Sequence, residues 1–223
     1  MAASFVDLYA RAAARKGGDA ALEALLTSPK TAAELAAIPD DRWLSDMTRR
    51  IFQSGFNWKV VDGKWDGFEA AFWGFDVGRC ALMSDEDLDA LVSDTRIVRN
   101  GAKIRSVREN AAFLQDLAGE YGSAAKCFAA WPAEDYAGLL EMLKKRGSRL
   151  GGRVGAIAMR FMGRDGYLLS EDVVKALIRE GVVDKEPTAR KDMAAVQAAF
   201  NAWAAESGRP LSHISRVLAF GVG

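Results

Sequence analysis

Apolar residues recur at helical spacing along almost the whole chain, and this periodicity most strongly limits what the chain can fold into. Between residues 101 and 118, for example, one helical face carries Ile104, Val107, Ala111, Leu114 and Leu117. The same spacing predicts further helices over about 4–14, 19–26, 41–53, 84–92, 134–146, 153–162, 170–180, 188–206 and 211–219. No alternating pattern longer than residues 59–62 indicates a strand. The sequence therefore predicts an all-α fold.

The length and composition fit one globular domain, or one domain with a small appendage. The chain has 223 residues, of which 50% are apolar and 27% charged. Alanine is frequent near the N-terminus, so we expect residues 1–40 to form an N-terminal helical extension. No apolar run approaches the roughly 18 residues of a membrane span, and the N-terminus lacks the apolar stretch of a secretory signal. We expect a cytoplasmic monomer that contacts no membrane.

Residues that hold metals or form disulfides are scarce. The chain has two cysteines, Cys80 and Cys127, and a single histidine, His213. These numbers exclude a disulfide scaffold and a His-rich metal site. Each cysteine is interpreted as a small buried hydrophobe, and His213 as a surface or capping residue. We expect no metal and no other cofactor.

Charge is distributed unevenly, although the formal net charge is zero. Residues 142–164 contain no acidic residue and carry Lys144, Lys145, Arg146, Arg149, Arg153, Arg160 and Arg164. Residues 96–108 are likewise free of acid and carry Arg96, Arg99, Lys103, Arg105 and Arg108. A single window of this kind is typical of a solvated helix flank. Two of them favour a basic face that binds a polyanion.

A glycine-rich turn joins two predicted helices inside the first basic window. Its sequence is KKRGSRLGGRVG at 144–155, with glycine at Gly147, Gly151 and Gly152. Glycines let the backbone come close to a partner, and the following helix N-terminus offers unpaired N–H groups to a phosphate. The pattern is equally consistent with a plain helix–helix turn. It is not a nucleotide P-loop, because it lacks a preceding strand and Gly-Lys-Ser/Thr.

Several strings together resemble the DNA-3-methyladenine glycosylase I family of helix-hairpin-helix glycosylases. They are QSGFNW at 53–58, FEAAFWGFD at 68–76, MSDEDLDAL at 83–91, RIVRNGAKI at 96–104, Asn110-Ala111 and KKRG at 144–147. The resemblance extends from about Trp43 to Val174 and implies an all-α helix-hairpin-helix glycosylase domain over 41–223. It also implies a protein that flips a damaged base out of duplex DNA and hydrolyses its N-glycosidic bond.

The resemblance assigns roles to the segment that ends at the pocket tryptophan. Gly55 and Phe56 would wedge into the duplex, and Trp58 would stack on the flipped base, with Arg50 and Asn57 beside it in the pocket. Without the resemblance, core packing is the ordinary role of such Phe and Trp residues. Contacts with the DNA backbone are expected from Lys144, Gly147, Arg149, Gly151, Gly152, Arg153, Arg99 and Lys103, where Arg99 and Lys103 could instead pack against the pocket.

The chain departs from the family pattern at several positions. The family carries a base-recognising glutamate where this chain has Arg50, and a cation there would repel a cationic 3-methyladenine. Arg50 would better suit a neutral or anionic lesion edge. A zinc-ligand histidine of the family aligns with Asp172, so no zinc is expected. The catalytic aspartate of the wider superfamily aligns with Ser170, beside Glu171 and Asp172, so the catalytic residue stays unassigned. No lysine follows the hairpin, which argues against lyase chemistry.

Three functions therefore stay open. The first is a monofunctional glycosylase of base-excision repair, acting on double-stranded DNA with an alkylated or otherwise damaged base of the 3-methyladenine type. In a bacterium such a protein would associate with the nucleoid. The second is a non-catalytic DNA-binding protein with the same fold. The third is a protein-interaction module whose basic hairpin binds an acidic partner. A glycosidase with paired carboxylates among Asp66, Glu69 and Asp76 is also conceivable, but no pair is favoured.

Overall fold

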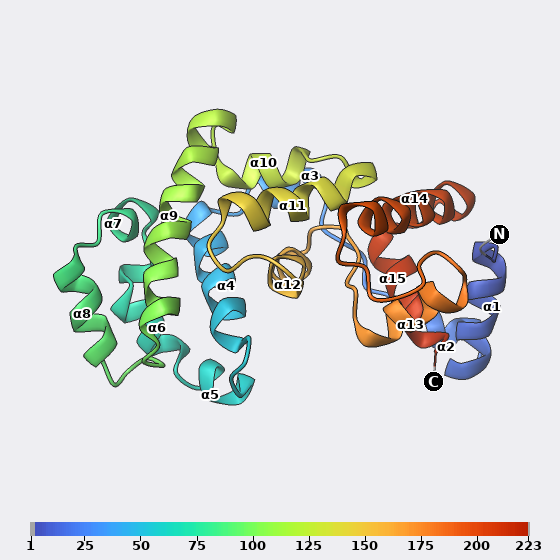
Figure 1. The fold of residues 1–223 in the computed structure, drawn as a ribbon, viewed down its shortest axis with the longest axis horizontal. Coiled ribbons are helices and arrows are strands. Elements are labelled where there is room, and N and C mark those ends of the chain that lie inside the picture. The colour runs from blue at the N-terminus through green and yellow to red at the C-terminus, as the bar shows by residue number, and fades with distance from the viewer. Residues whose placement is uncertain (1–2, 223) are drawn as a thin grey trace. The chain divides into compact units, whose positions relative to one another are not determined.

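Every regular element in the described part of this computed structural model, residues 3–222, is a helix (Figure 1). The prediction of an all-α fold is confirmed. The predicted helices are found with shifts of a few residues at their ends. The short alternating stretch at 59–62 belongs to helix α5, Trp58–Asp62. Among the described residues, no helix is long and apolar enough to cross a membrane.

The chain forms two compact units. The hairpin unit comprises residues 31–131 and 139–162, and the terminal unit comprises the residues up to 30, 132–138 and those from 163 onward. These units are defined by contacts within the folded chain. The expected division into an N-terminal extension over 1–40 and a glycosylase-like domain over 41–223 is a different kind of division and stays a prediction.

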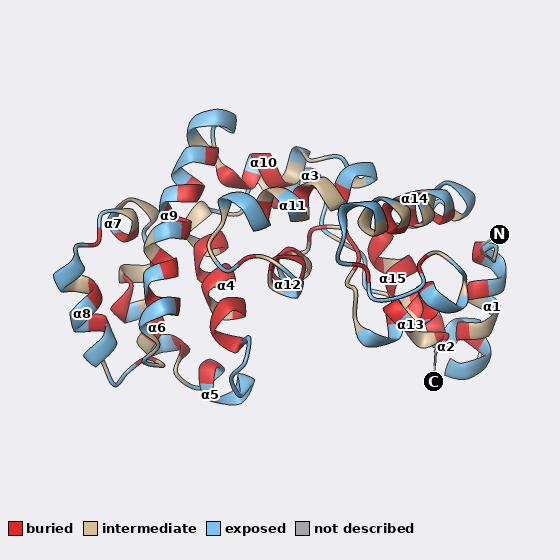
Figure 2. Cartoon of the chain, in the orientation of Figure 1, coloured by how far each residue is buried: buried red, intermediate tan, exposed pale blue. Residues whose placement is uncertain are grey.

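The hairpin unit holds most of the helices. They are α3 (Ala32–Ala36), α4 (Asp40–Gln53), α5, α6 (Trp65–Ala71), η1 (Trp73–Phe75), α7 (Val77–Ala81), α8 (Asp85–Ser93), α9 (Gly101–Tyr121), α10 (Ala124–Ala130), most of α11 (Tyr136–Arg146) and α12 (Arg153–Met162). Helix α9 packs against α4, α7, α8 and α10, and α12 packs against α4. Figure 2 shows buried residues along the faces where these helices meet.

Local sequence signals explain where several of these helices begin and end. Ser84 and Asp87 form the predicted capping box at the start of α8. Asn100 caps α9, and Gly122, with φ +84°, ends it in the left-handed conformation. The Asp40 carboxylate accepts hydrogen bonds from the N–H groups of Ala124 and Ala125 at the start of α10. This contact fixes the start of α4 against α10.

A stack of aromatic rings fills the space between α4 and α6. Trp65 lies parallel to Phe68 at 4.9 Å and to Phe75 at 5.6 Å. The Glu69 carboxylate beside them accepts hydrogen bonds from Arg42, Ser45 and the Trp65 indole. Burial would raise the pKa of Glu69, but these donors outweigh it and lower that pKa. Glu69 is thus committed to holding α6 against α4, which leaves no reason to assign it to a catalytic carboxylate pair.

Both cysteines are free and buried, as predicted. Burial raises the pKa of Cys80 to about 12 and that of Cys127 to about 11. At neutral pH both side chains are protonated thiols, which are poor nucleophiles.

The terminal unit joins the two ends of the chain. Its helices are α1 (Phe5–Lys16), α2 (Asp19–Glu23), η2 (Ala133–Asp135), the first residues of α11, α13 (Glu171–Arg179), α14 (Arg190–Ser207) and α15 (Leu211–Phe220). The Glu206 carboxylate accepts from the Phe5 N–H at 2.9 Å, and the Trp203 indole donates to the Ala3 carbonyl at 3.0 Å. The N-terminal helix is therefore bound to α14 by polar as well as apolar contacts.

Candidate functional site

The glycine-rich turn between α11 and α12 forms a tight hairpin. A Cβ on Gly147 would lie 2.6 Å from Leu150 Cδ1 and 2.8 Å from the Leu143 carbonyl oxygen, so no side chain fits there. Gly152 has φ +60°, which favours glycine. The fully buried Asn110 of α9 binds the turn twice: its amide donates to the Ser148 carbonyl at 3.0 Å and accepts from the Ser148 N–H at 2.8 Å. The hairpin is thus fixed against α9.

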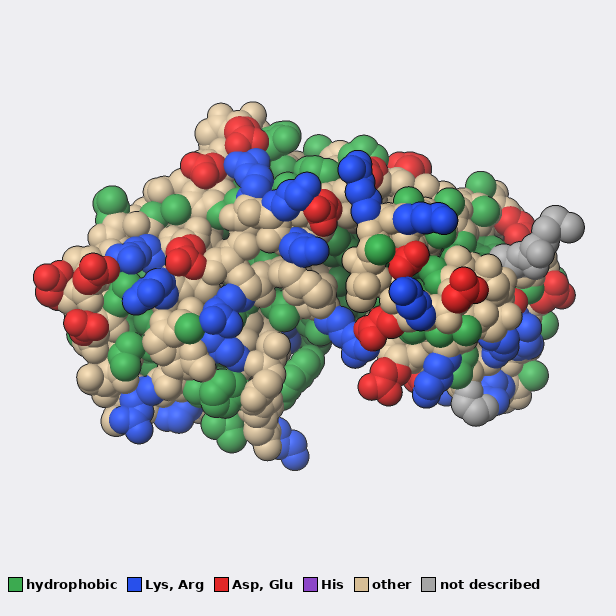
Figure 3. All heavy atoms as spheres, viewed as in Figure 1, with side chains coloured by type: hydrophobic (Ala, Val, Ile, Leu, Met, Phe, Trp, Pro, Cys, Tyr) green, Lys and Arg blue, Asp and Glu red, His purple; other side chains and the backbone are tan. Residues whose placement is uncertain are grey.

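The hairpin brings most of the predicted backbone-binding residues together. Lys144, Arg149 and Arg153 are exposed around it, and no protein acceptor within the described residues takes the Gly151 or Gly152 N–H. Arg149 has φ +59° and donates to the Ala102 carbonyl at 3.3 Å. Figure 3 shows Lys and Arg side chains over this part of the hairpin unit and acidic side chains over the start of α8. Exposed cations and unpaired N–H groups make the hairpin suitable for an anion.

The two other cations expected at the DNA backbone, Arg99 and Lys103, differ in exposure. Arg99 is exposed before the start of α9. Lys103, by contrast, is 8% exposed, and its ammonium donates to the Phe52 carbonyl at 3.2 Å and to that of Ser54. Burial lowers the pKa of Lys103, and the nearby charge of Arg149 adds to the effect. These contacts fix the C-terminus of α4 and agree with packing against the pocket, whereas a phosphate contact by Lys103 stays a prediction.

The segment after α4 presents aromatic side chains to solvent. Phe56 is 41% exposed and Trp58 is 45% exposed, so the alternative of core packing is wrong for both. Gly55, with φ +78°, turns the chain between α4 and α5. The Lys103 ammonium lies 4.6 Å from the centre of the Phe56 ring, and this cation–π contact holds the segment in place. The Asn57 side-chain oxygen accepts from the Lys59 N–H and caps α5, and a place for Asn57 in the base pocket stays a prediction.

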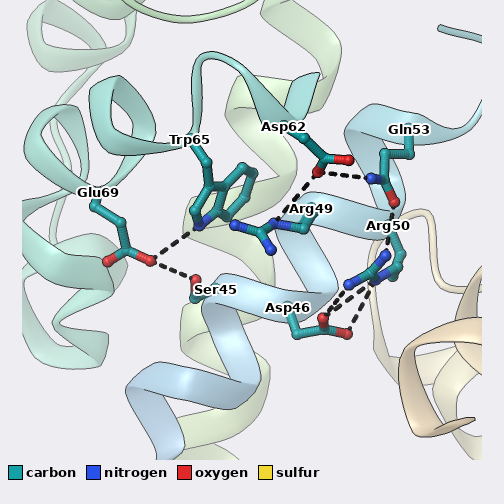
Figure 4. Close-up of polar contacts among 8 residues, drawn as sticks. All are labelled: Ser45, Asp46, Arg49, Arg50, Gln53, Asp62, Trp65 and Glu69. Carbon is teal, nitrogen blue, oxygen red and sulfur yellow. Dashed lines mark hydrogen bonds and ion pairs between the residues drawn. The ribbon is translucent and has the colours of Figure 1, made fainter. Parts of the chain in front are cut away.

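Arg50 is buried, and each of its three guanidinium nitrogens donates a hydrogen bond (Figure 4). Its Nε and Nη2 donate to the Asp46 carboxylate at 3.1 and 2.6 Å, and its Nη1 donates to Gln53 Oε1 at 2.8 Å. The Gln53 amide in turn donates to Asp62 at 2.9 Å. Burial raises the pKa of Asp46, while its hydrogen bonds with Arg50 oppose that rise. Asp46 offsets the positive charge of Arg50, and three of the five guanidinium N–H groups are engaged by Asp46 and Gln53.

Phe161, near the end of α12, joins Arg50 to Trp58. The Arg50 guanidinium carbon lies 3.7 Å from the centre of the Phe161 ring, and the Trp58 ring lies 6.3 Å away at an interplanar angle of 61°. Phe161 is 54% exposed. Sequence reasoning missed this residue. The available signal was an aromatic side chain off the buried face of α12, which carries Gly155, Ala156, Ala158, Met159 and Met162.

A hollow of about 320 Å³ lies between the end of α4 and the hairpin. Its lining comprises Ile51, Ser54, Lys103, Arg149, Gly151 and Val154. The exposed cation here is Arg149, whereas Lys103 is buried. The hollow is thus continuous with the hairpin's anion-binding features.

The acidic residues beside Ser170 lie in the terminal unit and act as ordinary first-turn residues. Ser170 caps α13 by accepting from the Val173 N–H, and Glu171 and Asp172 follow in the first turn. Asp172 pairs with Lys175 at 3.8 Å. Within residues 3–222, no group of three or more His, Cys, Asp or Glu side chains could hold a metal ion. The structure singles out no catalytic residue.

Comparison with known proteins adds a family match. The model of a family described as methyladenine glycosylase matches residues 38–154. DNA-3-methyladenine glycosylase 1 of Escherichia coli (strain K12) is 39% identical over 64 residues, which are 28% of this chain and 34% of that protein. The chain therefore matches about a third of the length of this curated relative.

Solved structures of similar proteins were also found. A crystal structure of 3-methyladenine DNA glycosylase I (TAG) is 24% identical, with a TM-score of 0.47 over 62% of this chain and 81% of that one. A structure of 3-methyladenine DNA glycosylase I (TAG) from Staphylococcus aureus is 20% identical, with a TM-score of 0.48 over 56% of this chain and 76% of that one.

Proposed function

Since the chain belongs to the methyladenine glycosylase family, whose model matches just over half of its length, we propose that it releases an alkylated base from duplex DNA. The observation that carries this proposal is the pairing of exposed Phe56 and Trp58 with a glycine hairpin in one compact unit. Aromatic side chains are usually buried, so their exposure beside an anion-binding turn needs a functional reason.

In this proposal the hairpin grips the DNA backbone without reading sequence. The N–H groups of Gly151 and Gly152 and the cations of Lys144, Arg149 and Arg153 would bind phosphates. Arg99 would extend the same basic surface. Binding should weaken steeply with salt, because each phosphate contact releases a counterion.

Phe56 and Trp58 would act on the base itself. Phe56 is placed on a short, exposed segment and would fill the gap left in the base stack, which needs an apolar wedge. Trp58 would stack on the extruded purine, because an indole face attracts a cationic alkylated ring. Asp46 offsets the charge of Arg50, so the repulsion expected from sequence is largely removed.

The proposed reaction is hydrolysis of the bond between C1′ of the sugar and the base nitrogen. The bond's electron pair goes to the base, which leaves neutral if it was a cation, and a water oxygen bonds to C1′ and loses a proton. A cationic alkylated purine is already a good leaving group, so the protein needs chiefly to bind and extrude it. Imine chemistry is not expected, because residues 153–156 directly after the hairpin include no lysine and the Lys103 ammonium is held by carbonyls.

The test is release of free base from methylated duplex DNA, measured by chromatography for the wild type, Trp58→Ala and Arg50→Glu. We expect release by the wild type and loss of at least about tenfold in Trp58→Ala, from the lost stacking energy. No release by the wild type together with release by Arg50→Glu would mean that the scaffold is active but that Arg50 has changed its specificity.

The second candidate is a DNA-binding protein without catalysis. It is favoured by Arg50, which takes the place of the family's base-recognising glutamate and spends its donors on Asp46 and Gln53. Salt-dependent binding to duplex DNA with no base release from any of the three proteins would establish it. Monomeric state and association with DNA in the cell stay predictions.

A further inference from the structure

We propose that Phe161 and Trp58 together form the base-selecting surface, and that this surface takes alkylated purines as a class, with no more than about 200-fold discrimination between methylated adenine and methylated guanine. This inference rests on the proposed function. It assigns Phe161 a role in specificity and predicts a breadth of substrate that follows from the contacts around Arg50.

The two rings form an open corner. Trp58 comes from the start of α5 and Phe161 from the end of α12, and their centres lie 6.3 Å apart at 61°. Both are about half exposed. A purine stacked on Trp58 would therefore place an edge against Phe161, which is a favoured arrangement of aromatic rings.

The Arg50 guanidinium packs on the Phe161 ring in a cation–π contact. It lies 3.7 Å from the ring centre, and its own position is fixed by Asp46 and Gln53. Phe161 is therefore held in place although it is exposed. The charge that reaches the corner is small, because Asp46 lies 2.6 Å from the guanidinium.

The polar side chains nearest to the corner are bonded to one another. The Arg50 guanidinium donates hydrogen bonds to Asp46 and Gln53, and the Gln53 amide donates one to Asp62. Arg50, which contacts Phe161, and Gln53 therefore have partners within the protein, and the corner itself offers a base two aromatic rings. Asp62, at the far end of this series of bonds from Phe161, has a half-exposed carboxylate.

This arrangement limits how well the site can discriminate. A site whose buried polar groups are satisfied only by the right substrate rejects others by about 10⁴-fold or more, because the wrong substrate leaves those groups unpaired. An apolar surface that offers only contact area discriminates by about 10–200-fold. The corner is of the second kind, and adenine and guanine present similar purine faces to it.

The experiment uses the whole chain and duplex DNA methylated to contain both 3-methyladenine and 7-methylguanine. The release rate of each base is divided by its spontaneous release from the same DNA, which removes the difference in leaving-group lability. We expect the two accelerations to agree within about 200-fold. A larger difference would overturn the inference while leaving the proposed function intact.

Three variants isolate the ring and the polar contacts. Phe161→Leu keeps an apolar side chain and should slow release of both bases alike, by about tenfold or more. Phe161→Tyr keeps the aromatic ring and should release both bases at about the wild-type rates. Asp62→Asn should leave the ratio of the two bases unchanged; a shift of that ratio beyond tenfold would mean that a carboxylate reads the base, against the proposal. Tyr121→Leu, at an exposed aromatic residue at the end of α9, is the matched control.

A second measurement separates this inference from the proposed function. Free 3-methyladenine and 7-methylguanine are titrated into the protein, and the quenching of tryptophan fluorescence that is lost in Trp58→Phe is recorded. We expect both bases to quench Trp58, with dissociation constants within about 200-fold of each other. If the wild type releases no base but both bases quench, the proposed function fails and the inference about selection stands. If neither base quenches Trp58, the inference fails.

Discussion

The two compact units differ in where their aromatic side chains lie. The hairpin unit exposes Phe56, Trp58 and Phe161. The terminal unit exposes no aromatic side chain among its described residues, although both units bury charged side chains, such as Arg50 in the hairpin unit and Arg164 in the terminal unit. The terminal unit follows the usual burial of aromatic rings in stable proteins. The hairpin unit departs from it, and such departures are expected where a protein binds something.

Two tryptophans, one in each unit, sharpen this contrast most strongly. Trp203→Ala should cost about 3–5 kcal/mol of unfolding free energy, because Trp203 is 3% exposed and its removal leaves a cavity. Trp58→Ala should cost less than about 1 kcal/mol, because that side chain is nearly half exposed. Denaturant unfolding followed by circular dichroism measures both. Equal costs would show that Trp58 is a packing residue, whatever its effect on base release.

One glycine in each unit tests whether DNA affinity depends on the backbone of the hairpin alone. Gly155→Ala should cost about 2–3 kcal/mol, since its Cβ would lie 2.5 Å from the Leu150 carbonyl oxygen and force the hairpin apart. Gly208→Ala in the terminal unit meets no atom within 4 Å, and its φ of +67° should cost about 1 kcal/mol. DNA affinity, measured by fluorescence anisotropy, should fall for Gly155→Ala alone. Loss of affinity in both variants would contradict a phosphate site confined to the hairpin.

Two lysines of the hairpin unit test which cations face DNA. Lys144→Gln should reduce the slope of log affinity against log salt by about 0.9, the value for one phosphate contact. Lys103→Met should leave that slope unchanged and slow base release, because its ammonium fixes the loop that carries Phe56. Anisotropy titrations between low and moderate salt measure both slopes. A reduced slope for Lys103→Met would show that Lys103 does contact a phosphate.

Helices and turns were largely predictable because their signals are local. The capping box at Ser84, the helical spacing of α9 and the glycines of the hairpin each depend on residues close in the sequence. The resemblance that led to the family came from similarly local strings, and the family is confirmed by the match over residues 38–154.

The contacts of the site were less predictable because they join distant segments. The exchange at Arg50 was visible in the sequence, but its compensation by Asp46 depends on which rotamers bring the two side chains together one turn apart. Lys103 binds carbonyls about fifty positions earlier in the chain, at Phe52 and Ser54, so composition alone placed it with the phosphate-binding cations. Phe161 meets Trp58 only through the packing of α12 on α4.

His213 gives the smallest and most local test, in the terminal unit. Burial lowers its pKa below the usual 6.5, and its Nε2 is buried without a hydrogen-bond partner among the described residues. The unfolded chain therefore takes up a proton first as the pH falls through 6.5, so acidification should destabilise the fold. The chain has no other histidine, and the window from pH 7.5 to 5.5 lies above the titration of ordinary carboxylates. Melting temperatures at constant ionic strength should fall less across this window for His213→Asn than for the wild type. An equal fall in melting temperature for both proteins would show that His213 does not cause the pH sensitivity.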